Sequence, residues 1–217
     1  MLEYALFTPE LWQNRIPKIN TAELSAAIEK CFKHTHATVS TSLYPKQTRH
    51  DLHFKKTAYN WLNFCINLPP CYDEVGKLIG HTEFGDIYLS NSELRDFAFL
   101  FLNGKIIFDF WGIIGDDFHV TRWMFADFPI DFAKLPEDKI AQLLPMVDEL
   151  ERAMKEATSF KVNAGRKVGN YNLAKCRHVT DRSDKIFAEY LGLDAVWQDI
   201  ELLYSQIVKT NFDDENE

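Results

Sequence analysis

The sequence predicts one α+β domain, in which a small mixed or antiparallel sheet in the N-terminal half packs against helices and the C-terminal half is mostly helical. The composition supports a packed globule, because 46% of the 217 residues are hydrophobic and 14% are aromatic. Short alternating or β-branched segments concentrate before residue 90, and helical spacing of apolar residues dominates after it. No repeat or long linker divides the chain, so we expect a single domain over residues 1–217.

The N-terminal half is expected to contain a helix followed by strands. Thr21 is a suitable N-cap for a helix that continues to about Phe32. After this helix, alternation and β-branched residues favour short strands in the segments 38–43, 51–55, 61–66 and 85–89. Prolines between these segments indicate turns.

A capping box from Ser90 to Glu93 predicts the start of a strongly apolar helix in the middle of the chain. This helix is expected to end near Gly104. The apolar segment 105–111 is compatible with either a strand or a helix, and Gly112 interrupts the chain after it. A sheet with the apolar helix packed on it is the expected assembly.

Helices dominate the expected C-terminal half. Pro136 suits the first turn of a long amphipathic helix. Thr180 is expected to cap a second helix, which Gly192 ends, and the segment 196–207 has the spacing of a last helix. The acidic tail 211–217 is expected to be disordered.

A cytoplasmic protein without a membrane partner is expected. No apolar run approaches the ~20 residues that a spanning helix needs, and the first residues lack the basic start of a signal peptide. The cysteines form no CxxC pair and mostly neighbour apolar residues, which favours reduced, partly buried thiols over disulfides or zinc ligands. They are Cys31, Cys65, Cys71 and Cys176.

Charge is distributed unevenly along the chain, whose formal net charge is -8. Between Lys161 and Lys185, seven basic residues stand against two acidic ones. Asparagines, a tyrosine and two glycines are interleaved with these cations, a combination that suits contacts with phosphates and with base edges or base rings. A solvated charged loop is an equally good interpretation. The candidate DNA-contacting residues are Lys161, Arg166, Lys167, Asn170, Tyr171, Asn172, Lys175 and Arg177.

Two groups of residues could be metal ligands. The first group consists of the histidines His34, His36, His50 and His53. No matched second pair of ligands accompanies them at zinc spacing, so exposed or packed histidines are expected instead. The second group, Asp131 with Glu137 and Lys139, loosely imitates a metal-dependent nuclease. Acidic residues in a first helical turn follow from the helix dipole alone, so no metal is expected.

Motifs for catalysis are absent from the sequence. There is no glycine-rich phosphate or dinucleotide loop and no serine nucleophile elbow. The run Asn67-Leu-Pro-Pro-Cys-Tyr72 resembles the Asn-Pro-Pro-Tyr loop of amino-directed DNA methyltransferases at a glance, but Leu68 and Cys71 interrupt it. We therefore expect no catalytic residue and no bound cofactor in this chain.

Three runs in the middle of the chain resemble a known family in their content and order. They are Asn103-Gly-Lys-Ile-Ile-Phe-Asp-Phe-Trp111, Gly115-Asp-Asp-Phe-His-Val-Thr-Arg122 and Phe128-Pro-Ile130. A similar helix, a Gly-Asp-Gly-Phe-His-like turn and a Phe-Pro stop occur in the C-terminal part of bacterial adenine-specific DNA methyltransferases of type II and type IIG restriction-modification systems. Further similar segments, at 12–19, 44–50 and 169–172, extend the resemblance over most of the chain.

The resemblance implies the target-recognition region of such an enzyme. In this family the catalytic half holds S-adenosylmethionine, and the C-terminal region helps to recognise the target DNA. The implied partners are double-stranded DNA and a methyltransferase catalytic domain or subunit, which would carry the cofactor. The chain would not be catalytic alone. A split subunit, a stand-alone protein and a trimmed piece of a longer chain all fit this interpretation.

A second candidate DNA contact is the turn that contains Asp117, His119, Thr121 and Arg122. A purely structural turn is an equal alternative. The chain departs from the family pattern at Asp117, where glycine is frequent, and at Gly104, where serine is usual. A metal-dependent nuclease and a protein-binding structural or regulatory module remain as alternative functions.

Overall fold

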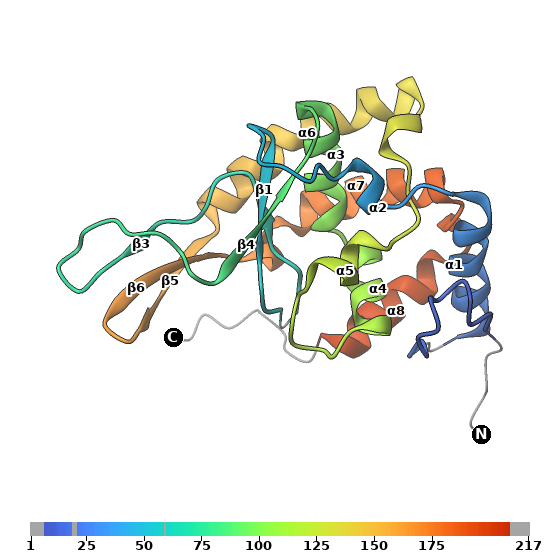
Figure 1. The fold of residues 1–217 in the computed structure, drawn as a ribbon, viewed down its shortest axis with the longest axis horizontal. Coiled ribbons are helices and arrows are strands. Elements are labelled where there is room, and N and C mark those ends of the chain that lie inside the picture. Colours follow the sequence, from blue (N-terminus) through green and yellow to red (C-terminus); the bar gives the residue numbers. More distant parts are fainter. Residues whose placement is uncertain (1–6, 19–20, 59, 209–217) are drawn as a thin grey trace.

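The computed structural model describes residues 7–18, 21–58 and 60–208 and confirms the predicted α+β class (Figure 1). The helices are α1 (Ala22–His34), α2 (Val39–Ser42), α3 (Ser92–Leu102), α4 (Lys105–Ile114), α5 (Arg122–Ala126), α6 (Glu137–Glu156), α7 (Arg177–Leu191) and α8 (Trp197–Ile207). The short 3-10 helices are η1 (Phe132–Lys134), η2 (Leu173–Cys176) and η3 (Asp194–Val196). The strands are β1 (Asp51–Lys55), β2 (Phe64–Cys65), β3 (Cys71–Tyr72), β4 (Phe84–Tyr88), β5 (Thr158–Asn163) and β6 (Arg166–Tyr171). The strands form two antiparallel sheets.

The first sheet has the strand order β2-β1-β4 and packs against α3. Alternate residues of β1 are buried, so that Leu52 and Phe54 face the core. There the ring of Phe54 meets that of Phe125 edge-on, at a centroid distance of 5.3 Å. The strands predicted at 51–55 and 85–89 are confirmed, the second with a shift of one residue.

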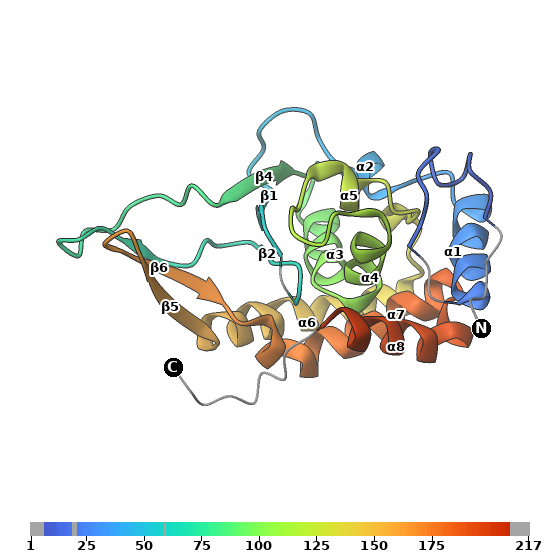
Figure 2. The same cartoon turned by 90° about the horizontal axis from the view of Figure 1, so that it is seen from below.

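Helices α3 and α4 form the centre of the core, and α6, α7 and α8 pack against them (Figure 2). Every residue from Phe97 to Ile113 is buried. The side chain of Asn103 holds the corner between the two helices, because it accepts a hydrogen bond from the Phe64 N–H at 3.0 Å and donates one to the Phe64 carbonyl at 2.9 Å. These bonds satisfy a polar group that would otherwise be costly to bury.

Among the described residues, no single helix has both the length and the apolar composition needed to cross a membrane. Helices α3 and α4 meet these requirements only as a pair, and the pair is bent by 68°. Their side chains account for the buried centre of the fold. The burial of both helices explains why this part of the sequence is so apolar.

A buried ionic cluster joins α4 to α7. The carboxylate of Asp184 accepts a hydrogen bond from the backbone N–H of Lys105 at 2.7 Å, and thus caps α4 from a neighbouring helix. Gly104 leaves room for this cap, because a Cβ atom there would collide with Asp184 Oδ1. Burial raises the pKa of Asp184 to about 7. Burial, together with the nearby Asp184, raises the pKa of Asp109 well above its ordinary range.

The second sheet has the order β3-β6-β5 and projects from the helices as an arm, at the left of Figure 1 and again in Figure 2. We use "arm" for residues 71–83 and 158–171. Strands β5 and β6 form a hairpin that is paired along its whole length. Ala164 and Gly165 close the hairpin with φ values of 47° and 78°. Positive φ at both central residues is typical of the tight turn that matches the twist of a hairpin.

The strand predicted at 38–43 is wrong, because this segment contains the helical turn α2. The hydroxyl of Thr41 donates a hydrogen bond to the Thr38 carbonyl at 2.7 Å. Val39 is completely buried in the core. Local hydrogen bonding and burial thus outweigh the strand preference of these β-branched residues.

The structure also settles one open assignment and corrects two predicted helix starts. The segment 105–111, compatible with either structure in the sequence, is helical. Thr180 does not cap a helix but lies inside α7, which begins at Arg177. Asn91, and not Ser90, accepts the capping hydrogen bond at the start of α3. Both errors concern a helix start, which sequence patterns locate less precisely than the helix itself.

Two predicted helix ends are confirmed, and one expectation about the basic segment changes. The hydroxyl of Thr21 caps α1, and Gly192 ends α7 in the left-handed conformation. The first part of the basic segment, 161–171, belongs to the pair of strands β5 and β6 in the C-terminal half and is not a loop. The acidic tail 211–217 lies outside the described residues.

Candidate nucleic-acid interface

The arm has two different faces, because successive side chains of a strand point to opposite sides of the sheet. Residues that are paired across neighbouring strands lie on the same side, so the register assigns each side chain to a face. One side, which we name the aromatic face, carries Tyr72, Leu78, Phe160, Val162 and Lys167. The other side, the basic face, carries Cys71, Lys161, Asn163, Arg166 and Val168.

On the aromatic face, two rings lean toward each other across β6. The centroids of Tyr72 and Phe160 are 6.2 Å apart, and the ring planes are tilted by 38°. The ammonium group of Lys167 lies over the Phe160 ring, 4.6 Å from its centroid. Phe160 is 41% exposed and Val162 is 79% exposed. A sheet surface with this much exposed apolar area is typical of a binding site.

Cations without close acidic partners lie on the hairpin. Lys161, Arg166 and Lys167 are all exposed. Within the described part of the chain, no carboxylate oxygen lies within 4.0 Å of their charged nitrogens. The hairpin residues 158–171 include no Asp or Glu at all. The hairpin itself therefore carries only positive charges, in a chain whose net charge is -8.

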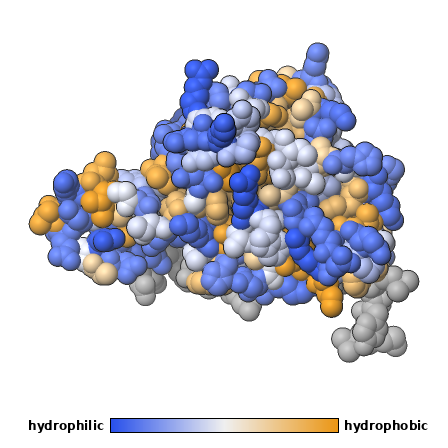
Figure 3. All heavy atoms as spheres, viewed as in Figure 1, coloured by the Kyte–Doolittle hydropathy of each residue, from blue (hydrophilic) through white to orange (hydrophobic). Residues whose placement is uncertain are grey.

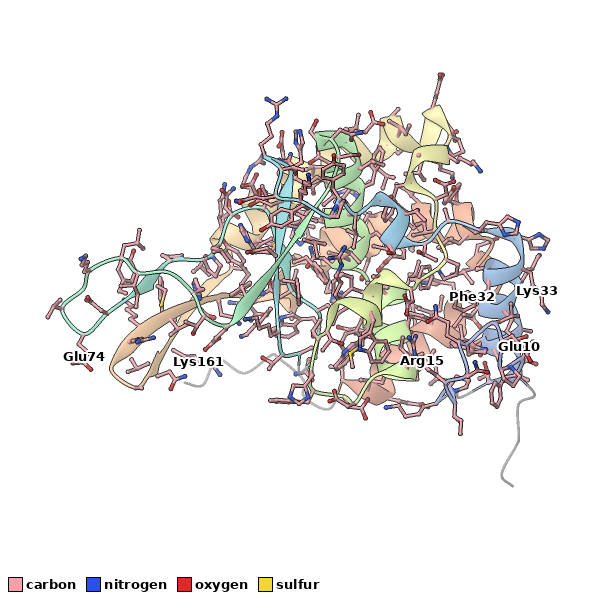
Figure 4. All side chains as sticks on the ribbon, viewed as in Figure 1. Glu10, Arg15, Phe32, Lys33, Glu74 and Lys161 are labelled. Carbon is pink, nitrogen blue, oxygen red and sulfur yellow. The ribbon has the colours of Figure 1, made fainter. Side chains whose placement is uncertain are left out.

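The acidic residues of the arm belong to the loop between β3 and β4. They are Asp73, Glu74 and Glu83, and Lys77 is the basic residue of the same loop. Figure 4 labels Glu74 and Lys161 on the arm. Glu74 Oε1 would lie 2.5 Å from a Cβ atom at Gly165, so this carboxylate reaches the hairpin turn. Glu74 thus offsets positive charge at the hairpin turn, and the positive charge of the hairpin is strongest along its strands, away from the turn.

A half-open hollow of about 180 Å³ lies on the basic face. Arg166 and Asn163 of the hairpin line one side of it, and His81 and Glu83 of the loop line the other. His81 is 2.6 Å from the Pro69 carbonyl, which holds the imidazole ring in place. The hollow offers both a cation and a carboxylate to a polar ligand group.

Lys55 extends the basic face toward the first sheet. Its ammonium group donates a hydrogen bond to the side-chain oxygen of Asn170 at 3.0 Å. Burial lowers the pKa of Lys55, and the nearby charge of Lys161 adds to this effect, whereas Glu83 opposes it. Asn170 is half-buried, and this hydrogen bond links the hairpin to β1.

Two of the residues predicted to read DNA bases have structural roles instead. Tyr171 is buried, its hydroxyl donates to the Asn67 carbonyl at 3.0 Å, and burial raises its pKa. Asn172 accepts a hydrogen bond from the Ala174 N–H at 3.1 Å and begins η2. Neither side chain is free to stack on a base or to contact a base edge in this structure.

The basic segment of the sequence does not form one surface. Lys175 is exposed on η2, beyond the root of the arm. Arg177 is half-buried, stacks over the Tyr204 ring at 4.7 Å and donates to the Tyr204 hydroxyl at 2.5 Å. Arg182 is paired with Glu149. Only the hairpin cations remain together as a candidate phosphate-binding surface.

The turn before α5 is built from its own hydrogen bonds. Asp116 accepts bonds from the His119 side chain at 2.5 Å and from the His119 backbone N–H at 2.7 Å, and these bonds lower the pKa of Asp116 to about 2. Asp117 has a φ of 66°, in the region that favours glycine, and pairs with Lys18 at 2.8 Å. Thr121 precedes α5, and Arg122 is its first residue; both side chains are exposed. This turn lies on the core and not on the arm (Figure 1).

Several of the residues considered as metal ligands have other partners. Asp131 accepts from the Ala133 N–H at 3.2 Å, and Lys139 is paired with Glu189. His53 is hydrogen-bonded to Asp86 at 2.7 Å. Across the described ranges, no group of three or more His, Cys, Asp or Glu residues is placed to hold a metal ion.

Sequence reasoning overlooked the aromatic face. Tyr72 drew attention only as the last residue of the run Asn67-Leu-Pro-Pro-Cys-Tyr72, and Phe160 follows a long helix, so nothing in the sequence pairs the two rings. The signal that could have found them is the alternation of Thr158, Phe160 and Val162, which favours a strand with one apolar face.

Apolar side chains also gather at the tip of the arm, at the left of the space-filling view in Figure 3. Val75 is 87% exposed and Leu78 is 64% exposed.

Comparison with family models, with curated proteins and with solved structures finds no match to this chain. The candidate interface therefore has to be interpreted from its own geometry.

Proposed function

We propose that the protein binds double-stranded DNA through the arm, as the target-recognition part of an adenine-specific DNA methyltransferase or restriction-modification enzyme. In this proposal a partner domain or subunit supplies S-adenosylmethionine and the catalytic groups. The observation that carries the proposal is the β5–β6 hairpin, whose exposed cations Lys161, Arg166 and Lys167 have no carboxylate on the same hairpin. The resemblance in the sequence adds the enzyme class.

The shape of the arm suits the proposed ligand. The major groove of DNA admits a two-stranded β-ribbon, and several DNA-binding proteins read bases with such strands. The basic face would place Lys161 and Arg166 toward phosphates, and Asn163 beside them has an amide that can contact a base edge. The acidic remainder of the chain repels phosphates and so leaves the arm as the favoured contact.

A protein-binding module is the second candidate function. The exposed apolar side chains of Val75, Leu78 and Val162 favour it, because such patches often lie in protein interfaces. The two functions predict different responses to salt. Binding to DNA weakens steeply with salt, whereas binding through an apolar patch does not.

The test is fluorescence anisotropy with a short labelled duplex, measured over a series of salt concentrations. We expect the double variant Lys161→Ala/Arg166→Ala to weaken binding to all duplex sequences alike. We expect the slope of log affinity against log salt to become shallower by roughly 0.9 for each phosphate that the variant no longer neutralises. The matched control is Lys30→Ala/Lys46→Ala, which removes the same charge from exposed positions outside the arm. An equal decrease in affinity for both variants would show that the arm is not the surface that binds DNA.

A further inference from the structure

The aromatic face combines features that single-stranded nucleic acid requires, and the duplex proposal does not use them. We infer that this face binds unpaired bases of single-stranded DNA by stacking on Tyr72 and Phe160. The ammonium group of Lys167 lies over the Phe160 ring, and in the complex it would hold the phosphate adjacent to the stacked base. The inference deepens the proposed DNA-binding function and rests on it, because it names an unpaired strand as a second ligand of the same arm.

The geometry of the rings supports two stacking positions. Tyr72 and Phe160 come from the outer strands β3 and β5, and their rings approach each other over the central strand. The residue paired with Phe160 is Gly169, which has no side chain to separate the rings. Because the ring planes are tilted by 38°, they form two platforms for successive bases and not one continuous surface. The sheet register holds both rings in place before a ligand arrives.

The cation in the middle of this face distinguishes the ligand from a protein surface. Lys167 is flanked by Tyr72, Phe160 and Val162, and its ammonium group is 4.6 Å from the Phe160 centroid. An apolar protein surface docked here would bury this charge without a partner, which is unfavourable. A nucleic-acid strand offers a phosphate beside every base, so it can satisfy the rings and the cation together. A second copy of the chain would bring two Lys167 side chains together.

The two faces of the arm allow the two ligands to be separated by mutation. Lys161 and Arg166 lie on the basic face, whereas Tyr72 and Phe160 lie on the opposite side of the same sheet. Removing the rings should therefore affect single-stranded DNA, and removing Lys161 and Arg166 should mainly affect the duplex. This separation distinguishes a failure of the inference from a failure of the proposed function.

The experiment measures the binding of the full chain to three labelled probes at low salt. The probes are an oligothymidylate of about 12 nucleotides, an abasic strand of the same length and a duplex. We expect Tyr72→Leu/Phe160→Leu to weaken oligothymidylate binding about tenfold or more and to change duplex binding less than about twofold. Tyr44→Leu, which removes an exposed tyrosine outside the arm, is the matched control and should change neither. Phe160→Trp should strengthen oligothymidylate binding, because indole has a larger stacking surface.

Each outcome decides the question. Oligothymidylate that binds no better than the abasic strand, or equally well to the leucine variant, would overturn the inference. Duplex binding without any single-strand binding would overturn the inference and leave the proposed function standing. Single-strand binding without duplex binding would support the inference and contradict the proposed function. If no probe binds, both are wrong, and the apolar patch is then better explained by a protein partner. Circular dichroism of each variant, together with the gain expected for Phe160→Trp, separates an effect on stacking from an effect on folding.

Discussion

Asp184 is buried between α4 and α7, and its carboxylate caps a helix other than its own. Burial raises its pKa from the ordinary 3.8 to about 7, which means that the folded protein holds this proton more tightly than the unfolded chain. The resulting stabilisation is complete below about pH 4 and is lost as the pH rises through about 7. The stability of the helical core should therefore depend on pH through Asp184, in the same direction as through its buried neighbour Asp109.

Replacing Asp184 by asparagine keeps an acceptor for the Lys105 N–H and removes the titration. We expect the free energy of unfolding of the unmodified protein to fall, relative to that of Asp184→Asn, by up to about 4 kcal/mol between pH 4 and pH 7. Urea unfolding over this pH range measures the difference. Asp148→Asn, a change of an exposed aspartate on α6, is the control. A constant difference between Asp184→Asn and the unmodified protein across the range would contradict the prediction.

Single residues also explain why the candidate site could be predicted only in part. Arg166 and Arg177 belong to the same basic stretch of sequence, yet Arg166 is exposed on the arm and Arg177 packs against Tyr204. Nothing in their sequence neighbours separates these two environments. The difference arises from α8, which lies far along the chain and places Tyr204 beside Arg177. Charge clusters can be found in a sequence, but tertiary contacts decide which charges face solvent.

At the scale of elements, the hairpin turn contains a residue, Ala164, in an unfavourable backbone conformation. Ala164 has a φ of 47°, a conformation in which alanine is unfavourable by about 1 kcal/mol and which asparagine tolerates better. We expect Ala164→Asn to slow hydrogen exchange of the paired β5 and β6 amides by up to about fivefold, since 1.4 kcal/mol corresponds to a factor of ten. Ala133→Asn, at an exposed position without positive φ, should leave these amides unchanged. Faster exchange in Ala164→Asn would show that the turn does not limit the hairpin.

Elements with strong local signals were predicted correctly, and those that depend on distant partners were not. Thr21 and Gly192 act on hydrogen bonds within their own helices, so the sequence alone is sufficient. The segment 38–43 has strand-like residues but packs as a helical turn against distant parts of the core. Strand β3 has two residues, and its pairing with β6 joins segments nearly 100 positions apart, which no local pattern predicts.

At the scale of the whole molecule, the proposed function assigns S-adenosylmethionine to a partner and so predicts that this chain alone does not bind it. The chain should neither bind S-adenosylmethionine nor transfer a methyl group to DNA, because the proposal assigns the cofactor and the catalytic loop to a partner. Titration calorimetry with the cofactor and a methyl-transfer assay on mixed DNA would measure both properties. Micromolar binding of the cofactor to this chain would contradict the assignment of the cofactor to a partner. The duplex used for the anisotropy measurements, added to the same titration, tests whether DNA changes the result.

The connection between core and arm determines how a bound ligand would be positioned. Strand β5 begins two residues after α6 ends, and the Asn172 N–H donates to the Ala157 carbonyl at this junction at 3.1 Å. Helix α6 has 20 residues and is therefore about 30 Å long. A length of about 30 Å corresponds to roughly nine base pairs of DNA at about 3.4 Å per step. Under the proposed function, a helix joined so directly to the arm would fix the distance between the DNA sequence that the arm contacts and a catalytic partner that binds at the far end of the helix.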